Sequence, residues 1–130
     1  MRLVLLPALL VLGACQTTAP RAPAAQPAVE GALAELLAVA AAPDSRPERF
    51  ERFVADGADV TLADVRQLVR DASAGGRFRY EVEEYVVEPD AGDTWHVLRV
   101  VVAHASGPPR EVEFAFLSRA GAFRLGRIAR

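Results

Sequence analysis

Three side chains in this sequence have types and positions that suit chemistry. Cys15 is the only thiol in the chain, and it closes an apolar run near the N-terminus. Glu84 and His96 fall on two neighbouring predicted strands, where a carboxylate and an imidazole side by side would suit general acid–base work. The chemistry open to each of these residues depends on the elements that position it.

The leading peptide is typical of an export signal. Met1-Arg2 gives a positive start, and residues 3–12 are apolar, interrupted only by Pro7. This run is half the roughly 20 residues that a membrane-spanning helix needs. It ends in Leu-Gly-Ala-Cys at positions 12–15, where the small residues give a peptidase access to the backbone. The four residues resemble the lipobox of bacterial lipoprotein signal peptides.

The lipobox resemblance implies a membrane anchor. In that family the Cys sulfur, here that of Cys15, receives a diacylglyceryl group, the peptide over 1–14 is removed, and the new amine is acylated. Gln16 rather than Asp follows the Cys, which by resemblance to Gram-negative sorting patterns implies the outer membrane, with the domain facing the periplasm. The alternatives are an inner-membrane or Gram-positive location, or an ordinary signal peptide with a chance Cys near its cleavage site.

The residues that follow the anchor predict a tether and one soluble domain. Three prolines, at 20, 23 and 27, favour a semi-rigid, non-helical tether over 15–28. Residues 29–130 suit one domain with a modest core. A net charge of −2 gives no electrostatic footprint for nucleic acid. A single Cys excludes an internal disulfide, and no set of ligands at zinc-site spacing is present.

Apolar spacing predicts three helices in the first half of the domain. The first covers 29–42 and ends at Pro43. The second follows an S-x-x-E capping box at 45–48 and ends at Gly57. The third covers 62–72 and is closed by a Gly-Gly pair.

After Gly76 the apolar period changes from 3.6 to 2, which predicts strands. Short turn segments at 89–93, 106–109 and 120–121 join four strands into an antiparallel meander. The predicted fold is therefore α+β, with three N-terminal helices packed on one face of a four-stranded antiparallel sheet. Centring the hairpins on these turns gives the expected cross-strand pairs: Tyr80 with Val102, Val82 with Val100, Val86 with His96, Val102 with Phe114, Val100 with Phe116, Phe116 with Phe123, and Phe114 with Leu125.

Three polar residues break the apolar pattern of the face expected to meet the helices: Glu84, His96 and His104. In the expected register Glu84 lies diagonal to His96, within reach of a long side chain. Burial and mutual charge would shift the pKa values of both groups. An exposed or structural pair at the hairpin end is the competing interpretation. A third is a pocket for a small apolar ligand, with Tyr80, Glu84, His96 and Phe116 around it.

The opposite face of the sheet is expected to carry Tyr85, Trp95 and Val97, more apolar area than a solvated face needs. Either loops cover these residues, or they form an interface with a protein partner or a second copy of the chain. The arginines near the C-terminus are expected to pair with strand glutamates, and secondarily to contact anionic lipid.

The order of elements resembles the NTF2-like (cystatin-like, SnoaL-type) superfamily. The resemblance rests on the last hairpin, over 113–117 and 121–125, and on the segment 53–58 before the third helix. It implies a cone-shaped pocket between the helices and the sheet. Members include enzymes, small-molecule binders and non-catalytic assembly modules, so the fold does not choose among them.

Taken together, the sequence predicts a lipid-anchored envelope protein without a catalytic constellation, cofactor or metal site. Its domain is expected to act through protein contact or self-association. The alternative is a periplasmic binder of a small apolar ligand, and a distant third is an enzyme that uses Glu84 and His96.

Overall fold

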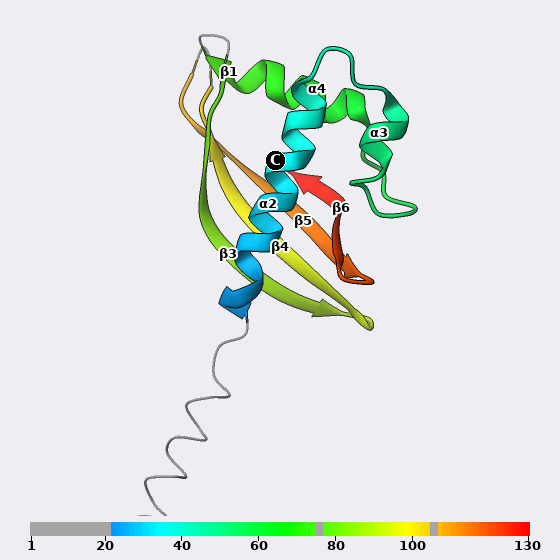
Figure 1. Ribbon diagram of the computed structural model, residues 1–130. Helices are drawn as coiled ribbons and strands as arrows, with labels where there is room; N and C mark the ends of the chain where they lie inside the picture. The colour runs from blue at the N-terminus through cyan, green and yellow to red at the C-terminus, as the bar shows by residue number, and fades with distance from the viewer. Residues whose placement is uncertain (1–21, 75–76, 105–106) are drawn as a thin grey trace, which may run out of the picture.

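The structure is a computed structural model that describes residues 22–74, 77–104 and 107–130. It is an α+β domain in which the helices precede the main sheet, as predicted. Helices α2, α3 and α4 lie on one side of a four-stranded sheet (Figure 1). The elements are α2 (Ala22–Ala41), α3 (Pro47–Glu51), α4 (Leu62–Ala72), β1 (Ser73–Ala74), β2 (Arg77–Phe78), β3 (Tyr80–Asp90), β4 (Asp93–Val102), β5 (Arg110–Arg119) and β6 (Ala122–Ala129).

Helix α2 begins at Ala22, so the prediction of a non-helical segment up to residue 28 is wrong from this residue on. Pro23 lies in the first turn, where a backbone N–H has no intrahelical acceptor and its loss costs nothing. Pro27 is inside the helix and forfeits one bond. The surrounding alanines favour helix, and buried Val29 and Leu33 fix its next turns against the core.

The same helix contains a window, Ala24–Ala41, that is long and apolar enough to cross a membrane by length and composition alone. In this structure a third of the window is buried inside the domain. Its buried side chains, among them Leu36 and Leu37, belong to the hydrophobic core. Burial in the core thus accounts for part of the apolar character of this helix.

Helix α3 is shorter than predicted and ends at Glu51 rather than near Gly57. The chain after it pairs with the last strand instead: the N–H of Leu125 donates to the carbonyl of Phe53 and the N–H of Ala55 donates to the carbonyl of Leu125, both at 2.8 Å. Val54 forms a parallel bridge to Leu125. Cross-strand hydrogen bonds have therefore replaced the last helical turns.

Helix α4 agrees with its prediction and is capped at its start by Thr61. The Thr61 N–H and hydroxyl both donate to the Asp64 carboxylate at 2.9 Å, and the Asp64 N–H donates back to the hydroxyl. This reciprocal cap satisfies backbone donors that the first turn leaves open. The accepted hydrogen bonds also hold the pKa of Asp64 below its usual range.

The main sheet is the predicted meander, in the order β3-β4-β5-β6. Two of its hairpins turn on two residues each, Ala91-Gly92 and Ala120-Gly121, and all four have positive φ. This is the type I′ turn, whose twist matches that of the flanking strands.

The predicted pairing of β3 with β4 is correct up to a β-bulge. Tyr80 pairs with Val102 and Val82 with Val100, as expected. The register then shifts between Val82 and Glu84, so His96 pairs with Val87 and not with Val86. A bulge adds one residue to one strand and exchanges the faces of all residues beyond it.

The predicted pairing of β4 with β5 is wrong by four residues, and that of β5 with β6 is wrong by two or three. Val102 pairs with Arg110 rather than Phe114, Val100 with Val112 rather than Phe116, and Phe116 with Leu125 rather than Phe123. The expected Phe114–Leu125 pair is also wrong: Phe114 pairs with Ile128, three residues further on, because a second bulge between Ala115 and Phe116 adds one residue to the two-residue difference seen at Phe116. Even steps keep each side chain on its face, so the predicted helix-facing residues of β4 and β5 do form the core.

Candidate functional site

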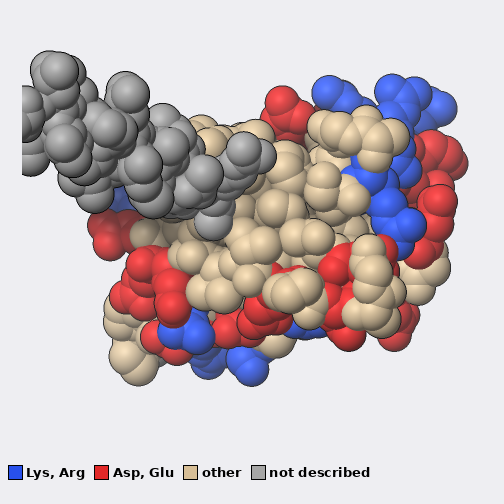
Figure 2. Space-filling model, turned by 90° about the horizontal axis from the view of Figure 1, so that it is seen from below, with Lys and Arg blue, Asp and Glu red and all other residues tan. Residues whose placement is uncertain are grey.

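The most specific motif of the sequence, Cys15 with its lipobox, lies outside the described residues. Its acylation stays a prediction from the sequence. The described part begins with α2 at Ala22, at the lower end of the domain in Figure 1. Seen from that end, the molecule presents a broad uncharged area bordered by carboxylates and arginines (Figure 2).

The expected Glu84–His96 pair is not formed. The bulge turns Glu84 to the face away from the helices, where its carboxylate accepts a hydrogen bond from Nη1 of Arg99 at 2.6 Å. It turns Tyr85 inward instead, and the Tyr85 hydroxyl lies 2.7 Å from Nδ1 of His96. The prediction of Tyr85 as an outer-face interface residue is therefore also wrong.

The Tyr85–His96 pair is enclosed by aromatic rings. The two rings stack with centroids 6.0 Å apart, and Phe123 meets the imidazole edge-on at 4.9 Å. His96 is 8% exposed, and Phe116 is its partner on β5. Burial lowers the pKa of His96 and raises that of Tyr85, which favours the uncharged form of each group.

The hydrogen bond between the Tyr85 hydroxyl and the neutral imidazole of His96 gives each of these polar groups a partner at the end of the core. Tyr80, the other residue expected at a pocket here, is five residues away along β3 and its ring lies 5.6 Å from that of Phe78. The residues predicted to form one ligand site are thus divided between two ends of the sheet and two faces. The arrangement suits packing better than catalysis.

The outer face of the sheet is covered by its own side chains. The Trp95 ring lies against Gly126, and the guanidinium carbon of Arg127 lies 4.8 Å from the ring centroid. Val97 is 6% exposed beside buried Ala115. Among the described residues, Val86, at 36%, is the large hydrophobic side chain that remains exposed.

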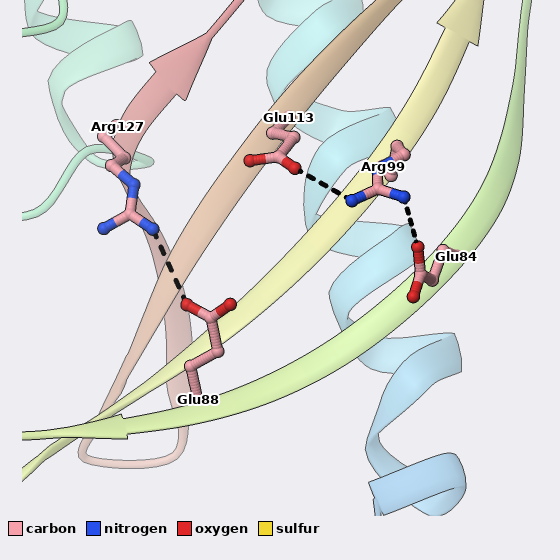
Figure 3. A network of polar contacts seen from close by, with 5 residues as sticks. All are labelled: Glu84, Glu88, Arg99, Glu113 and Arg127. Carbon is pink, nitrogen blue, oxygen red and sulfur yellow. Dashed lines mark hydrogen bonds and ion pairs between the residues drawn. The ribbon is translucent and has the colours of Figure 1, made fainter.

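Arginines and glutamates alternate on this outer face of the sheet (Figure 3). Arg99 on β4 lies between Glu84 of β3 and Glu113 of β5, with N–O distances of 2.6 and 3.4 Å. Arg127 reaches Glu88 at 3.8 Å, which confirms that a C-terminal arginine pairs with a strand glutamate. These pairs are solvent-exposed, so each contributes on the order of 0–1 kcal/mol to stability and mainly keeps the face solvated.

A groove lies at the opposite end of the domain from the start of α2. It occupies about 360 Å³ between the last turns of α4 and the ends of the sheet strands. Its apolar floor consists of Leu68, Ala72, Val102 and Val112. Its polar lining consists of Asp71, His104, Arg110, Glu111 and Arg130.

This groove combines an apolar floor with a charged rim, as ligand sites do. A larger and more open hollow of about 480 Å³ over α3 is lined by charged residues alone: Asp44, Arg46, Glu48, Arg49 and Arg52. Within the described residues no group of three or more His, Cys, Asp and Glu side chains could hold a metal ion. The groove is therefore the best candidate for a binding site.

Sequence reasoning identified only one lining residue of the groove, His104, as a break in the apolar pattern. Arg110 and Arg130 also break the apolar pattern of the inward face. Arg110 precedes the inward residue Val112 by two positions, and Arg130 follows the inward residue Ile128 by two positions. Because both arginines lie at strand ends, the alternation around them is too short for the break to be recognised.

Comparisons with protein-family models, with curated proteins and with solved structures found no match.

Proposed function

We propose that this chain is a lipid-anchored protein of the bacterial cell envelope whose domain binds a small, largely apolar ligand in the groove beside α4. The groove is the observation that carries the proposal. Its floor consists of four apolar side chains that are each 5% exposed or less, so binding there would chiefly bury the apolar surface of the ligand itself. The groove volume lies at the lower end of the range of about 300–1,000 Å³ for ligand sites.

The lipobox at Cys15 and Gln16 after it support acylation at the outer membrane, with the domain in the periplasm. From Cys15 to Ala22 the chain spans at most roughly 25 Å. Helix α2, 20 residues and about 30 Å long, then leads toward the end of the domain where α4 lies (Figure 1). The groove is lined by residues of the last turns of α4. An anchor before α2 would leave the groove open to the periplasm.

An NTF2-like assignment fits this proposal, because helices precede a four-stranded antiparallel sheet and cover one of its faces. Action through protein contact at Trp95 and Val97, the other expectation from the sequence, has less support. The Trp95 ring is already in contact with Gly126 and Arg127, and Val97 is buried.

Ligand binding is tested with N-phenyl-1-naphthylamine, an uncharged apolar dye whose fluorescence rises when it leaves water. The full chain carries Cys15→Ser, so that acyl chains do not compete. Asp71→Phe would fill the groove from its rim, whereas Ala63→Phe adds the same ring to an exposed position of α4 outside it. We expect Asp71→Phe to weaken dye binding about tenfold and Ala63→Phe to leave it unchanged. Equal dye binding in the two variants would contradict the proposal.

The anchor has a separate test. In a Gram-negative host grown with labelled palmitate, Cys15→Ser should abolish labelling and membrane retention, while the neighbouring control Thr17→Ser should keep both. Retention of Cys15→Ser in the outer-membrane fraction would contradict acylation at this residue.

A further inference from the structure

We infer that the ligand of this groove is a single-chain amphiphile with an anionic head group, held by Arg110 and Arg130. The inference rests on the proposed function and adds the chemistry of the ligand to it.

The register of the sheet brings the two arginines to the groove. Arg110 pairs with Val102 of β4 and precedes Val112 by two residues, so its side chain leaves the sheet on the side of the helices. Ile128 pairs with Phe114 and packs on the core, and Arg130 follows it by two residues. Both guanidinium groups thus border the floor formed by Val102 and Val112.

Neither arginine forms a close ion pair with a described neighbour, although the charge of Arg130 acts on the carboxylate of Asp64. In the described part of the chain, the side chains of Arg110 and Arg130 form no ion pair within 4.0 Å and no hydrogen bond. Arginines of the outer face, in contrast, do pair: Arg99 with Glu84 and Arg119 with Asp93. The groove therefore presents unpaired positive charge beside apolar surface.

The rim also holds two carboxylates, and that of Asp71 lies on the helix side and offsets part of this charge. It accepts a hydrogen bond from Nε2 of Gln67 at 2.7 Å, and because this amide is neutral the charge of Asp71 stays in place. Glu111 pairs with Val101 on the outer-facing row, where its charge acts on Arg99. On the helix side of the sheet the groove therefore holds two guanidinium groups, those of Arg110 and Arg130, and one carboxylate, that of Asp71.

These features together specify a ligand with two different ends. A guanidinium group binds a carboxylate or a phosphate through two parallel hydrogen bonds. The floor of Leu68, Ala72, Val102 and Val112 would take the apolar chain, and about 360 Å³ has room for one chain rather than several. A fatty carboxylate and an alkyl phosphate share this chemistry.

The test compares dodecyl compounds that differ only in their heads, each below its micelle concentration, as competitors of N-phenyl-1-naphthylamine on the full chain with Cys15→Ser. We expect laurate or dodecyl phosphate to displace the dye at concentrations about tenfold lower than dodecanol. Dodecyltrimethylammonium should compete no better than dodecanol. Whichever anion binds more tightly identifies the head group.

The matched variants are Arg110→Gln with Arg130→Gln in the groove, and Arg46→Gln with Arg49→Gln on α3. All four arginines are exposed, so the fold should persist in both double variants. The groove variant should lose the preference for an anionic head while still binding the dye, and the α3 variant should keep it. Dye binding without any preference between laurate and dodecanol would overturn this inference alone. Loss of specific dye binding would overturn the proposed function as well.

Discussion

The indole of Trp95 lies directly on the backbone of Gly126. A Cβ atom placed at position 126 would be 2.5 Å from Cζ3 of the ring, closer than non-bonded carbon atoms approach. Gly126 lies where the register between β5 and β6 shifts, between Leu125, which pairs with Phe116, and Arg127, which pairs with Ala115. This contact packs the Trp95 ring against the outer face of the sheet. It explains why a large aromatic residue at this position need not mark an interface.

We expect Gly126→Ala to lower the free energy of unfolding by about 1–3 kcal/mol, because the methyl group would push the ring off the sheet. Urea unfolding followed by the fluorescence of Trp95, the single tryptophan, measures this directly. Gly31→Ala is the control, since a Cβ at position 31 of α2 has open space around it. That substitution should stabilise the helix instead. An unchanged midpoint for Gly126→Ala would show that the ring is not held there.

Arg66 of α4 holds the C-terminal end of α2. Its guanidinium donates hydrogen bonds to the carbonyls of Ala40, Ala42 and Ser45, at 3.3, 3.1 and 2.9 Å. Carbonyls at a helix end lack intrahelical donors, so Arg66→Met should cost about 1–3 kcal/mol in urea unfolding. Arg70→Met, one turn further along and exposed, should cost less than about 0.5 kcal/mol. Equal losses for the two variants would contradict the role given to Arg66.

His96 should make stability depend on pH. Burial lowers the pKa of His96 in the folded state. Below the pKa of about 6.5 that a histidine has in the unfolded chain, the unfolded state therefore binds a proton that the folded state does not bind. The contribution of His96 to the free energy of unfolding is complete above pH 6.5, and it is lost as the pH falls toward the pKa of His96 in the folded state. The unfolding midpoint between pH 7.5 and 5.5 should therefore fall more steeply in the wild type than in His96→Gln. His104 remains in both proteins as an internal control. Parallel curves would contradict a buried, neutral His96.

The elements of this fold follow from the sequence because periodicity is a local property. The stripe of α4 and the alternation of the strands identify their buried faces without reference to any other segment. Even the wrong pairings between β4 and β5 kept each residue on its predicted face, since hairpin lengths were misjudged by even numbers.

The site is harder to predict because it depends on single residues that change the parity of a strand. One extra residue, at the bulge between Val82 and Glu84, exchanged Glu84 for Tyr85 beside His96 and removed the expected acid–base pair. No local pattern distinguishes that bulge from regular strand. The groove is hard to predict for another reason: Arg110 begins β5 and Arg130 directly follows β6, and only the register of these two strands brings both residues to the same end of the sheet.

The position at which a ligand binds tests the proposed groove most directly. Methyl resonances of the Cys15→Ser chain, followed during titration with laurate, report on Leu68, Val102 and Val112 at the groove and on Val82 and Val87 along the inward face of β3. We expect saturable shifts at the three groove residues and none at the two β3 residues. Shifts centred on Val87, beside Tyr85 and His96, or no saturable shift at the groove, would contradict this proposal.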